Sequence, residues 1–426
     1  MSRKRRKQKP IGLFLLMMIV VVGIGIYFNG SLDIFGNRDL EEPQDQGDKP
    51  LESPEPAEDT PKPPVDMVEE PRQETITIAA VGDIIYHMSQ IISAYNEEDD
   101  SYDFKKFFEL IKPIIEEADL AIANYEGTTA GTSVEPYMAY PRFNAPDETL
   151  DALKYAGFNL ISTINNHSLD MRGFGLIRTL EQLHKRGFKT VGTYSERPDS
   201  RVLYVNEKDI ELAFIAYTYS LNGMEISITA EELDYMVNVI DRDRILEDIL
   251  EAQAREVDMI IAIMHWGHEY QRNPSQEQRD LADFMFKNGV DIILGSHPHV
   301  IQDAEVVEYD GKKKFVIYSM GNFISNQREE SLNQYYPNLD NFYTEDGVIV
   351  QIAITKNFED NQTWISDLNF VPTWVNRYHH PPLYHYDVIP LPKYIEGNPL
   401  GLDEQTLSRM KRSYRDTMIK VDVTID

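Results

Sequence analysis

From residue 75 onward, short apolar runs alternate with longer amphipathic segments. The runs are rich in β-branched residues, which is typical of buried strands, and they occupy 75–81, 120–125, 158–164, 189–194, 212–218, 258–264, 290–295 and 314–320. The intervening segments have the spacing of helices with one apolar face, as at 103–118, 175–187, 242–257 and 277–289. This alternation predicts an α/β fold whose sheets are covered by helices on both faces.

The C-terminal third follows a different pattern. Residues 347–355 and 364–375 alternate apolar and polar positions, which indicates antiparallel strands with one solvated face. We expect them to complete the second sheet of a two-sheet sandwich. Residues 403–420 have the period of one last amphipathic helix, and the chain contains no internal repeat.

The N-terminal region has the pattern of a membrane anchor. Residues 11–28 are apolar or small and uncharged, and a helix of that length spans about 27 Å, close to the hydrocarbon thickness of a bilayer. The basic cluster within residues 1–10 predicts that the N-terminus is cytoplasmic, so the rest of the chain should lie outside the cell in a single-pass topology. The alternative is a cleaved signal peptide.

The composition of the rest of the chain distinguishes a stalk from a folded part. Residues 29–75 hold eight prolines and 14 acidic groups against four basic ones, which predicts a disordered stalk. We expect a folded domain over 76–378 and a C-terminal extension over 379–426 that packs on it. The formal charge of −30 argues against a nucleic-acid partner. Because the chain has no cysteine, it forms no disulfides, thiolate zinc sites or cysteine nucleophile.

Side chains that can bind metals follow five of the predicted strands. In open α/β sheets the ligand site lies at the carboxyl ends of the strands, and the residues found there are Asp83, Asn124, Glu126, Asn166, His167, His265, His297 and His299. Carboxylate, amide and imidazole groups without thiolates suit Mn, Fe or Zn. Alone, Asp83 is also explained as a helix cap. The joint set favours a centre with one or two divalent ions of the kind used in two-metal hydrolysis.

His297 and His299 flank a proline. Residues two apart in an extended segment point the same way, and Pro298 biases His297 toward an extended conformation. We therefore expect an extended segment that aims both imidazoles at one volume.

Six strings, in this order, resemble the CapA family of capsule-synthesis proteins, which includes the poly-γ-glutamate synthesis protein PgsA: AAVGDI, ANYEG, INNHSLD, MHWGHEY, LGSHPHVIQ and YSMGNF. They lie between about residues 78 and 323. That family looks like a branch of the calcineurin-like metallophosphoesterases. The resemblance implies their four-layer α/β/β/α sandwich.

The resemblance also implies roles for individual residues. One metal ion would be held by Asp83, Glu126 and His299. The other would be held by Glu126, Asn166, His265 and His297. His167 matches the histidine that protonates the leaving group. Weaker substrate contacts are expected from Asn124, His268, Glu269 and Asn322.

Two positions depart from the phosphoesterase pattern. Ile85 stands where that superfamily has a histidine, and Glu126 stands where it has a bridging aspartate. The first metal position therefore lacks one ligand, unless the nearby His87 supplies it. Metal binding is better supported than phosphoesterase catalysis.

Three functions remain open. The first is a membrane-anchored component that makes or exports an anionic polymer such as poly-γ-glutamate, together with membrane subunits of the same machine. The second is an extracellular metal-dependent phosphoesterase acting on a nucleotide, a sugar phosphate or a lipid-linked phosphate. The third is a non-catalytic scaffold that keeps the fold. Retention of His167 argues against a pure scaffold.

Overall fold

The strand β1 (Gln73–Ile84) lies in the middle of an eight-stranded sheet in the computed structural model, which describes residues 72–425. The order across this first sheet is β16 (Leu383–Pro390), β15 (Gln362–His380), β14 (Asp346–Asn357), β1, β4 (Leu120–Tyr125), β5 (Leu160–Ser162) and β6 (Lys189–Val191). The short β13 (Asn322–Ile324) also pairs with β1, parallel to it.

This sheet has a parallel half and an antiparallel half. β1, β4, β5 and β6 are parallel, whereas β14 pairs antiparallel with β1 and β15 and β16 follow in antiparallel order. The predicted strands at 347–355 and 364–375 therefore exist, but their assignment to the second sheet was wrong. Alternating polarity indicates a half-buried strand and does not say which strand is its neighbour.

The second sheet has six strands. Their order is β11 (Ala304–Tyr309), β12 (Lys312–Ile317), β10 (Ile292–Ser296), β9 (Met259–His265), β8 (Ile210–Thr218) and β7 (Leu203–Glu207). The four central strands are parallel, and the edge strands β11 and β7 are antiparallel to their neighbours. A separate pair is formed by β2 (Tyr95–Asn96) and β3 (Ser101–Tyr102).

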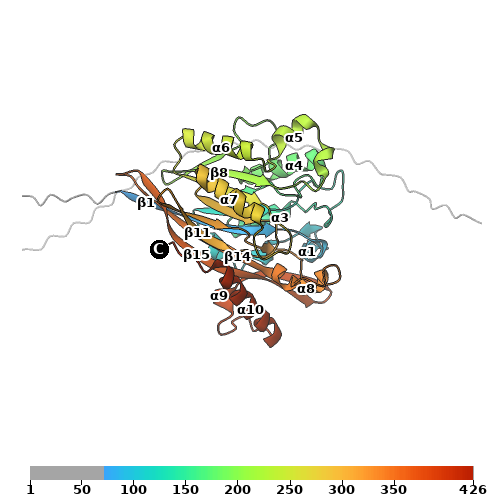
Figure 1. Ribbon diagram of the computed structural model, residues 1–426. Coiled ribbons are helices and arrows are strands. Elements are labelled where there is room, and N and C mark those ends of the chain that lie inside the picture. Colours follow the sequence, from blue (N-terminus) through green and yellow to red (C-terminus); the bar gives the residue numbers. More distant parts are fainter. Residues whose placement is uncertain (1–71, 426) are drawn as a thin grey trace, which may run out of the picture. The chain divides into compact units, whose positions relative to one another are not determined.

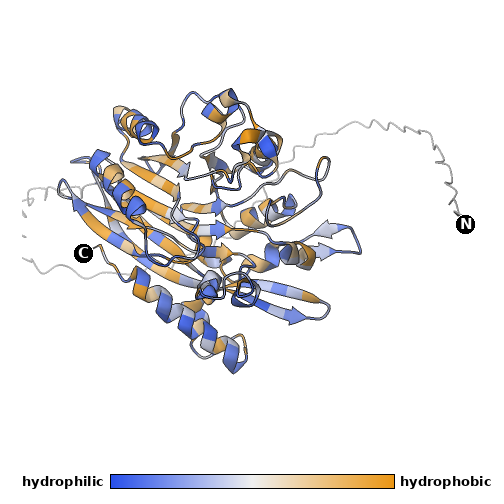
Figure 2. Cartoon of the chain, turned by 45° about the vertical axis from the view of Figure 1, so that its right-hand side comes forward, coloured by the Kyte–Doolittle hydropathy of each residue, from blue (hydrophilic) through white to orange (hydrophobic). Residues whose placement is uncertain are grey.

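Apolar side chains join the two sheets and cover their outer faces. One buried cluster combines Ile78 and Ile122 of the first sheet with Phe214 and Leu294 of the second. Because successive strand residues point to opposite faces, the alternate positions pack outward. In the first sheet they contact helix α3, and in the second sheet they contact α6 and α7. Figure 2 shows this arrangement as hydrophobic strands beneath helices that are hydrophilic on one side. The predicted mixed α/β fold is confirmed.

The α-helices mostly follow the sequence periodicity. They are α1 (Met88–Ala94), α2 (Lys112–Ile115), α3 (Glu148–Ala156), α4 (Arg172–Lys185), α5 (Ala230–Met236), α6 (Arg242–Ala254), α7 (Gln276–Asn288), α8 (Glu329–Leu332), α9 (Leu391–Tyr394) and α10 (Glu404–Val421). Within residues 72–425, three 3₁₀ turns occupy Lys105–Phe108, Met224–Ser227 and Asn341–Glu345.

One predicted helix is interrupted in the structure, so that prediction was wrong. The segment 103–118 forms a 3₁₀ turn and the short α2 in place of one helix. Pro113 lies in the first turn of α2. Proline lacks a backbone N–H and is tolerated at a helix start but not inside one, so the chain begins a new helix there.

The C-terminal region is tied to the first sheet. The boundary expected at residue 378 falls inside β15, and β16 continues the sheet beyond it. Helices α9 and α10 pack beside β15 (Figure 1), where Trp374, Ile389 and Met410 form a small core. The buried guanidinium of Arg328 lies 3.1 Å from Glu345, which also pairs with Arg409 of α10.

The membrane-anchor prediction concerns residues 11–28, which lie outside the described residues. None of the helices within residues 72–425 combines the length and the apolar character of a bilayer span.

Candidate metal centre

The predicted ligands come together at the carboxyl ends of the central strands. Asp83 lies near the end of β1, Glu126 directly follows β4, and His265 is the last residue of β9. The other members lie on the loops that follow β5 and β10: Asn166, His167, His297 and His299. All of these side chains are buried. The parallel halves of both sheets therefore aim their ends at one volume.

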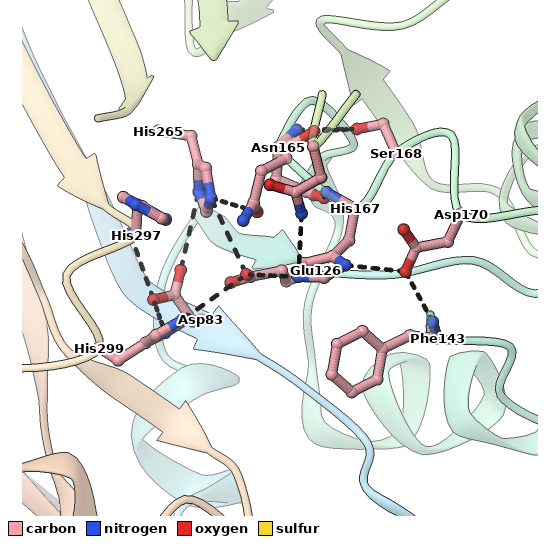
Figure 3. Close-up of polar contacts among 12 residues, drawn as sticks. Asp83, Glu126, Phe143, Asn165, His167, Ser168, Asp170, His265, His297 and His299 are labelled. Atoms are coloured by element: carbon pink, nitrogen blue, oxygen red, sulfur yellow. Dashed lines mark hydrogen bonds and ion pairs between the residues drawn. The ribbon is translucent and has the colours of Figure 1, made fainter. Parts of the chain in front are cut away.

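Glu126 lies at the centre of this group. Its Oε1 atom is 3.8 Å from His299 Nε2, 3.9 Å from His265 Nε2 and 4.0 Å from His167 Nε2. Figure 3 shows the carboxylate between His167 on one side and His265 and His299 on the other. These separations exceed hydrogen-bond length. The carboxylate is therefore surrounded by imidazoles without being bonded to them.

Asp83 organises the opposite side. Its Oδ2 atom lies 3.0 Å from His299 Nδ1 and accepts the backbone N–H of His297 at 3.2 Å. Its Oδ1 atom accepts the Asn124 side-chain amide at 2.8 Å. Asn124 thus lies beneath Asp83 and orients it. The substrate contact expected of Asn124 stays a prediction.

Two sets of three ligand atoms, sharing Glu126, lie within 4.8 Å of one another: Glu126 with His297 and His299, and Asp83 with Glu126 and His265. Asn166 belongs beside the second set, because its Oδ1 atom lies 2.9 Å from His265 Nε2. The predicted members are therefore together, but compared with the sets that the family resemblance implied, Asp83 and His297 have changed places: Asp83 lies with His265 and Asn166, and His297 lies with His299.

The donor set fits a divalent cation. Both Glu126 oxygens and the Nδ1 atom of His297 are buried and have no hydrogen-bond partner. A buried, unpaired carboxylate is costly. Burial raises the pKa of Glu126 well above its usual range, and the charges of Asp83 and Glu269 add to that rise. A cation bound among these groups would offset the cost and favour the ionised form.

Two of the imidazoles, those of His265 and His297, have pKa shifts that suit them to the same task. Burial lowers the pKa of His265 and His297 well below the ordinary value, with further lowering from neighbouring histidines. Burial also acts against protonation of His299, but the hydrogen bond and charge of Asp83 outweigh it and raise its pKa. Neutral imidazole is the form that binds metals.

The backbone of the His-Pro-His element is not extended, so that part of the prediction was wrong. His297 has φ 96° and His299 has φ 59°, in the left-handed region that non-glycine residues seldom adopt. The two rings still converge, with centroids 5.8 Å apart. Contacts with Asp83 override the local preference set by Pro298, and such strain often accompanies functional sites.

The remaining predicted contacts lie around this centre. Asn322 is buried and donates its amide to Thr344 O at 2.9 Å, so it holds a turn beside β1. His268 and Glu269 are exposed on the loop after β9. The charge of Glu269 reaches the centre, because it contributes to the raised pKa of Glu126.

His87 does not complete the first position with its Nδ1 atom, because that atom accepts the backbone N–H of Asn326 at 3.2 Å. Burial lowers the pKa of His87 to about 4, with help from His299. Ile85, which replaces the histidine expected from the phosphoesterase pattern, is buried in the core.

Asp170 is a residue that sequence reasoning missed. Its Oδ2 atom lies 2.8 Å from His167 Nδ1 and also accepts the backbone N–H of Phe143 at 2.6 Å. The Phe143 ring meets the His167 ring edge-on at 4.8 Å. The signal was present in the string NHSLD, where the carboxylate follows the histidine by three residues.

Sequence comparison decides the family. The description "Bacterial capsule synthesis protein PGA_cap" matches residues 77–327, more than half of the chain. The chain belongs to this family. The matched segment contains most of β1, all of β4, β9 and β10, and every residue of the candidate metal centre.

Two proteins named CapA are similar to the chain. The capsule biosynthesis protein CapA of Bacillus anthracis is 27% identical over 277 residues, which cover 62% of this chain and 64% of that protein. The PGA biosynthesis protein CapA of Bacillus subtilis (strain 168) is 27% identical over 271 residues, which cover 62% of this chain and 68% of that protein. The match thus spans less than two thirds of the B. anthracis relative.

Solved structures also resemble the chain. A phosphatase from Mycoplasma pneumoniae matches 79% of this chain and 100% of its own, with 15% identity and a TM-score of 0.41. The calcineurin-like phosphoesterase YfkN from Bacillus subtilis matches 82% of this chain and 99% of its own, with 15% identity and a TM-score of 0.38. Both likenesses concern the fold only.

Proposed function

We propose that this chain is a membrane-anchored, extracellular component of capsule synthesis or export that handles an anionic polymer such as poly-γ-glutamate. Its working part is a divalent-metal centre at the strand ends. The observation that carries the proposal is the buried Glu126 carboxylate, which lacks hydrogen-bond partners and has three imidazoles within 4.0 Å. Membership in the capsule synthesis family supports the biological setting.

The residues of this centre have separable tasks. Glu126, Asp83, His265, His297 and His299 would hold one or two ions of Mn, Zn or Fe, with Asn166 beside His265. A divalent ion bound there supplies Lewis-acid polarisation of a carbonyl or phosphoryl oxygen. Asn124 orients Asp83 through the amide hydrogen bond.

The second candidate function is an extracellular metal-dependent phosphoesterase with the four-layer sandwich of the calcineurin-like superfamily. The hydrogen-bonded His167–Asp170 pair favours it. With Nδ1–H donated to Asp170, the ring presents Nε2 toward Glu126 and the centre. A protonated His167 at that position can donate a proton to a leaving oxygen, which is general-acid catalysis. Such a pair has little purpose in a scaffold.

The placement of the chain belongs to the same proposal. Residues 1–10 would remain in the cytoplasm, 11–28 would span the membrane, and 29–75 would hold the domain away from it. Membrane subunits of the capsule machinery are the proposed partners. Protease added to wall-free cells should release a fragment that contains residues 76–426. A fragment accessible only after lysis contradicts this topology.

Polymer output in a host that lacks its own copy tests the function. Wild-type chain should restore the capsule polymer, and Glu126→Gln should fail to restore it at equal protein level. Glu181→Gln, on the exposed face of α4 (Arg172–Lys185), is the matched control and should behave like wild type. Wild-type polymer output from the Glu126→Gln variant would contradict the proposal. If that variant makes polymer but loses hydrolysis of p-nitrophenyl phosphate, the phosphoesterase candidate replaces it.

A further inference from the structure

A hollow of about 170 Å³ is lined in part by Met171 and Arg172, which directly follow Asp170 in the sequence. It has a mixed lining of charged and apolar side chains, among them Arg142, Arg172, Glu135, Val134, Met171 and Phe174. Val134 and Phe174 are large exposed apolar residues, at 63% and 46% exposure. The hollow thus combines cationic groups with an apolar wall.

The two arginines in this hollow are unpaired. Within residues 72–425, neither Arg142 nor Arg172 makes a side-chain hydrogen bond, an ion pair or a contact with an aromatic face, whereas every other arginine there has at least one such partner. The chain is strongly acidic, with 71 Asp and Glu against 41 Lys and Arg. Two arginines that line one hollow therefore have guanidinium groups available to an external anion.

Asp170 connects residues of this hollow with the metal centre. Arg142 precedes Phe143, whose N–H Asp170 accepts, and Arg172 follows Asp170 by two residues. The same carboxylate binds His167, whose Nε2 faces Glu126 at 4.0 Å. Figure 3 shows Phe143 and Asp170 on the side of His167 away from His265 and His299. A group bound by the arginines would lie beyond the His167 side of the centre.

We propose that Arg142 and Arg172 form a subsite for one carboxylate-bearing residue of the acidic polymer, adjacent to the metal centre; this inference rests on the proposed function. Guanidinium groups bind carboxylates through directed, charge-assisted hydrogen bonds. Val134, Met171 and Phe174 contact the methylene groups of the same residue. The combination selects a polymer with a carboxylate and a short aliphatic segment in each unit.

The apolar wall favours a γ-glutamyl unit over a bare phosphate group as the ligand of this hollow. A phosphate has no apolar surface to bury against Phe174, whereas each methylene of a γ-glutamyl unit does. Glu135 also lines the hollow and opposes any anion there. Its presence limits the affinity of one site, so an extended polymer that contacts several positions is favoured over a free monomer.

Binding of a fluorescent ten-residue oligo-γ-glutamate to the purified full-length chain tests the subsite, at low salt because exposed charges are screened. The double variant Arg142→Gln with Arg172→Gln should weaken binding about tenfold, with metal content unchanged. The matched control is Lys185→Gln with Lys189→Gln, which removes the same charge at and beyond the far end of α4. That control should stay within about twofold of wild type. Glu135→Gln should tighten binding about twofold.

Three outcomes overturn the subsite. Binding that is unchanged in the arginine variant does so, as does an equal loss in both double variants. The third is displacement of the oligomer by inorganic phosphate at a lower concentration than by glutarate. Each leaves the proposed function standing if Glu126→Gln still abolishes polymer output. Failure of the wild-type chain to bind oligo-γ-glutamate, together with normal output from Glu126→Gln, removes both.

Discussion

Asp170 Oδ2 lies 2.8 Å from His167 Nδ1, and the same oxygen accepts the backbone N–H of Phe143. The carboxylate therefore fixes the orientation of a ring that does not itself belong to either cluster of ligand atoms. A histidine held in this way can move a proton at Nε2 without holding the metal. This division between holding a cation and donating a proton yields the first prediction.

His167→Ala should retain the metal content and folding of the wild-type chain. If the centre is catalytic, polymer output or hydrolysis of p-nitrophenyl phosphate should fall about 10²-fold or more, the usual loss for a general acid. Elemental analysis and turnover measured on the same preparation check both parts.

Asp170→Asn should cause a smaller loss of turnover and should alter its pH profile, because the ring keeps its place but loses the carboxylate partner. His184→Ala is the control, since His184 bonds only Thr190 on the exposed side of α4. Loss of metal in His167→Ala would show that this histidine is a ligand and would contradict the division of roles.

The string AAVGDI contains the proposed metal ligand Asp83 and also Gly82, a position where close packing requires glycine. A Cβ atom on Gly82 would lie 2.0 Å from the Gly321 carbonyl oxygen. Gly82→Ala should therefore lower the free energy of unfolding by at least about 2 kcal/mol, because backbone must shift to make room.

Gly187→Ala gives the comparison. Gly187 has φ 74° and no atom within 4 Å of an added Cβ, so only the left-handed conformation should be penalised, by about 1 kcal/mol. Denaturant titration of the three chains measures the difference. Equal losses for the two variants would contradict the close approach of β1 and the Gly321 turn.

Stability should depend on pH through Asp346. Burial raises the pKa of this carboxyl to about 7, and Glu345 adds to the rise. The unfolded chain loses this proton near pH 4, whereas the folded chain keeps it until near pH 7. The folded state thus binds more protons in that window, so the contribution is fully present below about pH 4 and is lost as pH rises through 7.

Asp346→Asn should flatten this part of the profile, because the amide stays neutral at every pH. The free energy of unfolding, measured by denaturant at several pH values between 4 and 8, gives the result. Asp199→Asn, a surface change, should run parallel to wild type. A profile for Asp346→Asn that also parallels wild type would contradict the assignment.

Much of the centre was predictable because parallel strands end at a common edge. Asp83 and His265 each follow an uninterrupted apolar run, so their convergence needs only the strand assignment. Asp170 was not predictable in this way, since it contacts His167 only after the loop beyond β5 folds back on itself. Which three ligand atoms lie closest depends on rotamers that strand order does not determine.

In the fold, too, elements set by their own local pattern were predictable, whereas pairings between distant segments were not. Amphipathic periods predicted α4, α6, α7 and α10 closely, because each buries its own apolar stripe. The partner of β14 could not be deduced, since an alternating strand fits either sheet. The conformation of His297 was opposite to its local bias because its N–H bonds Asp83, far away in sequence.

The most direct test of the account is the metal content of the purified full-length chain. Wild-type protein supplied with Mn or Zn should hold about one or two ions per chain, and Glu126→Gln and His297→Ala should each lose most of this metal while remaining folded. Glu181→Gln should match wild type. A wild-type chain that holds less than about a tenth of an ion, or a Glu126→Gln variant with full occupancy, would contradict the claim that these buried side chains form a metal centre.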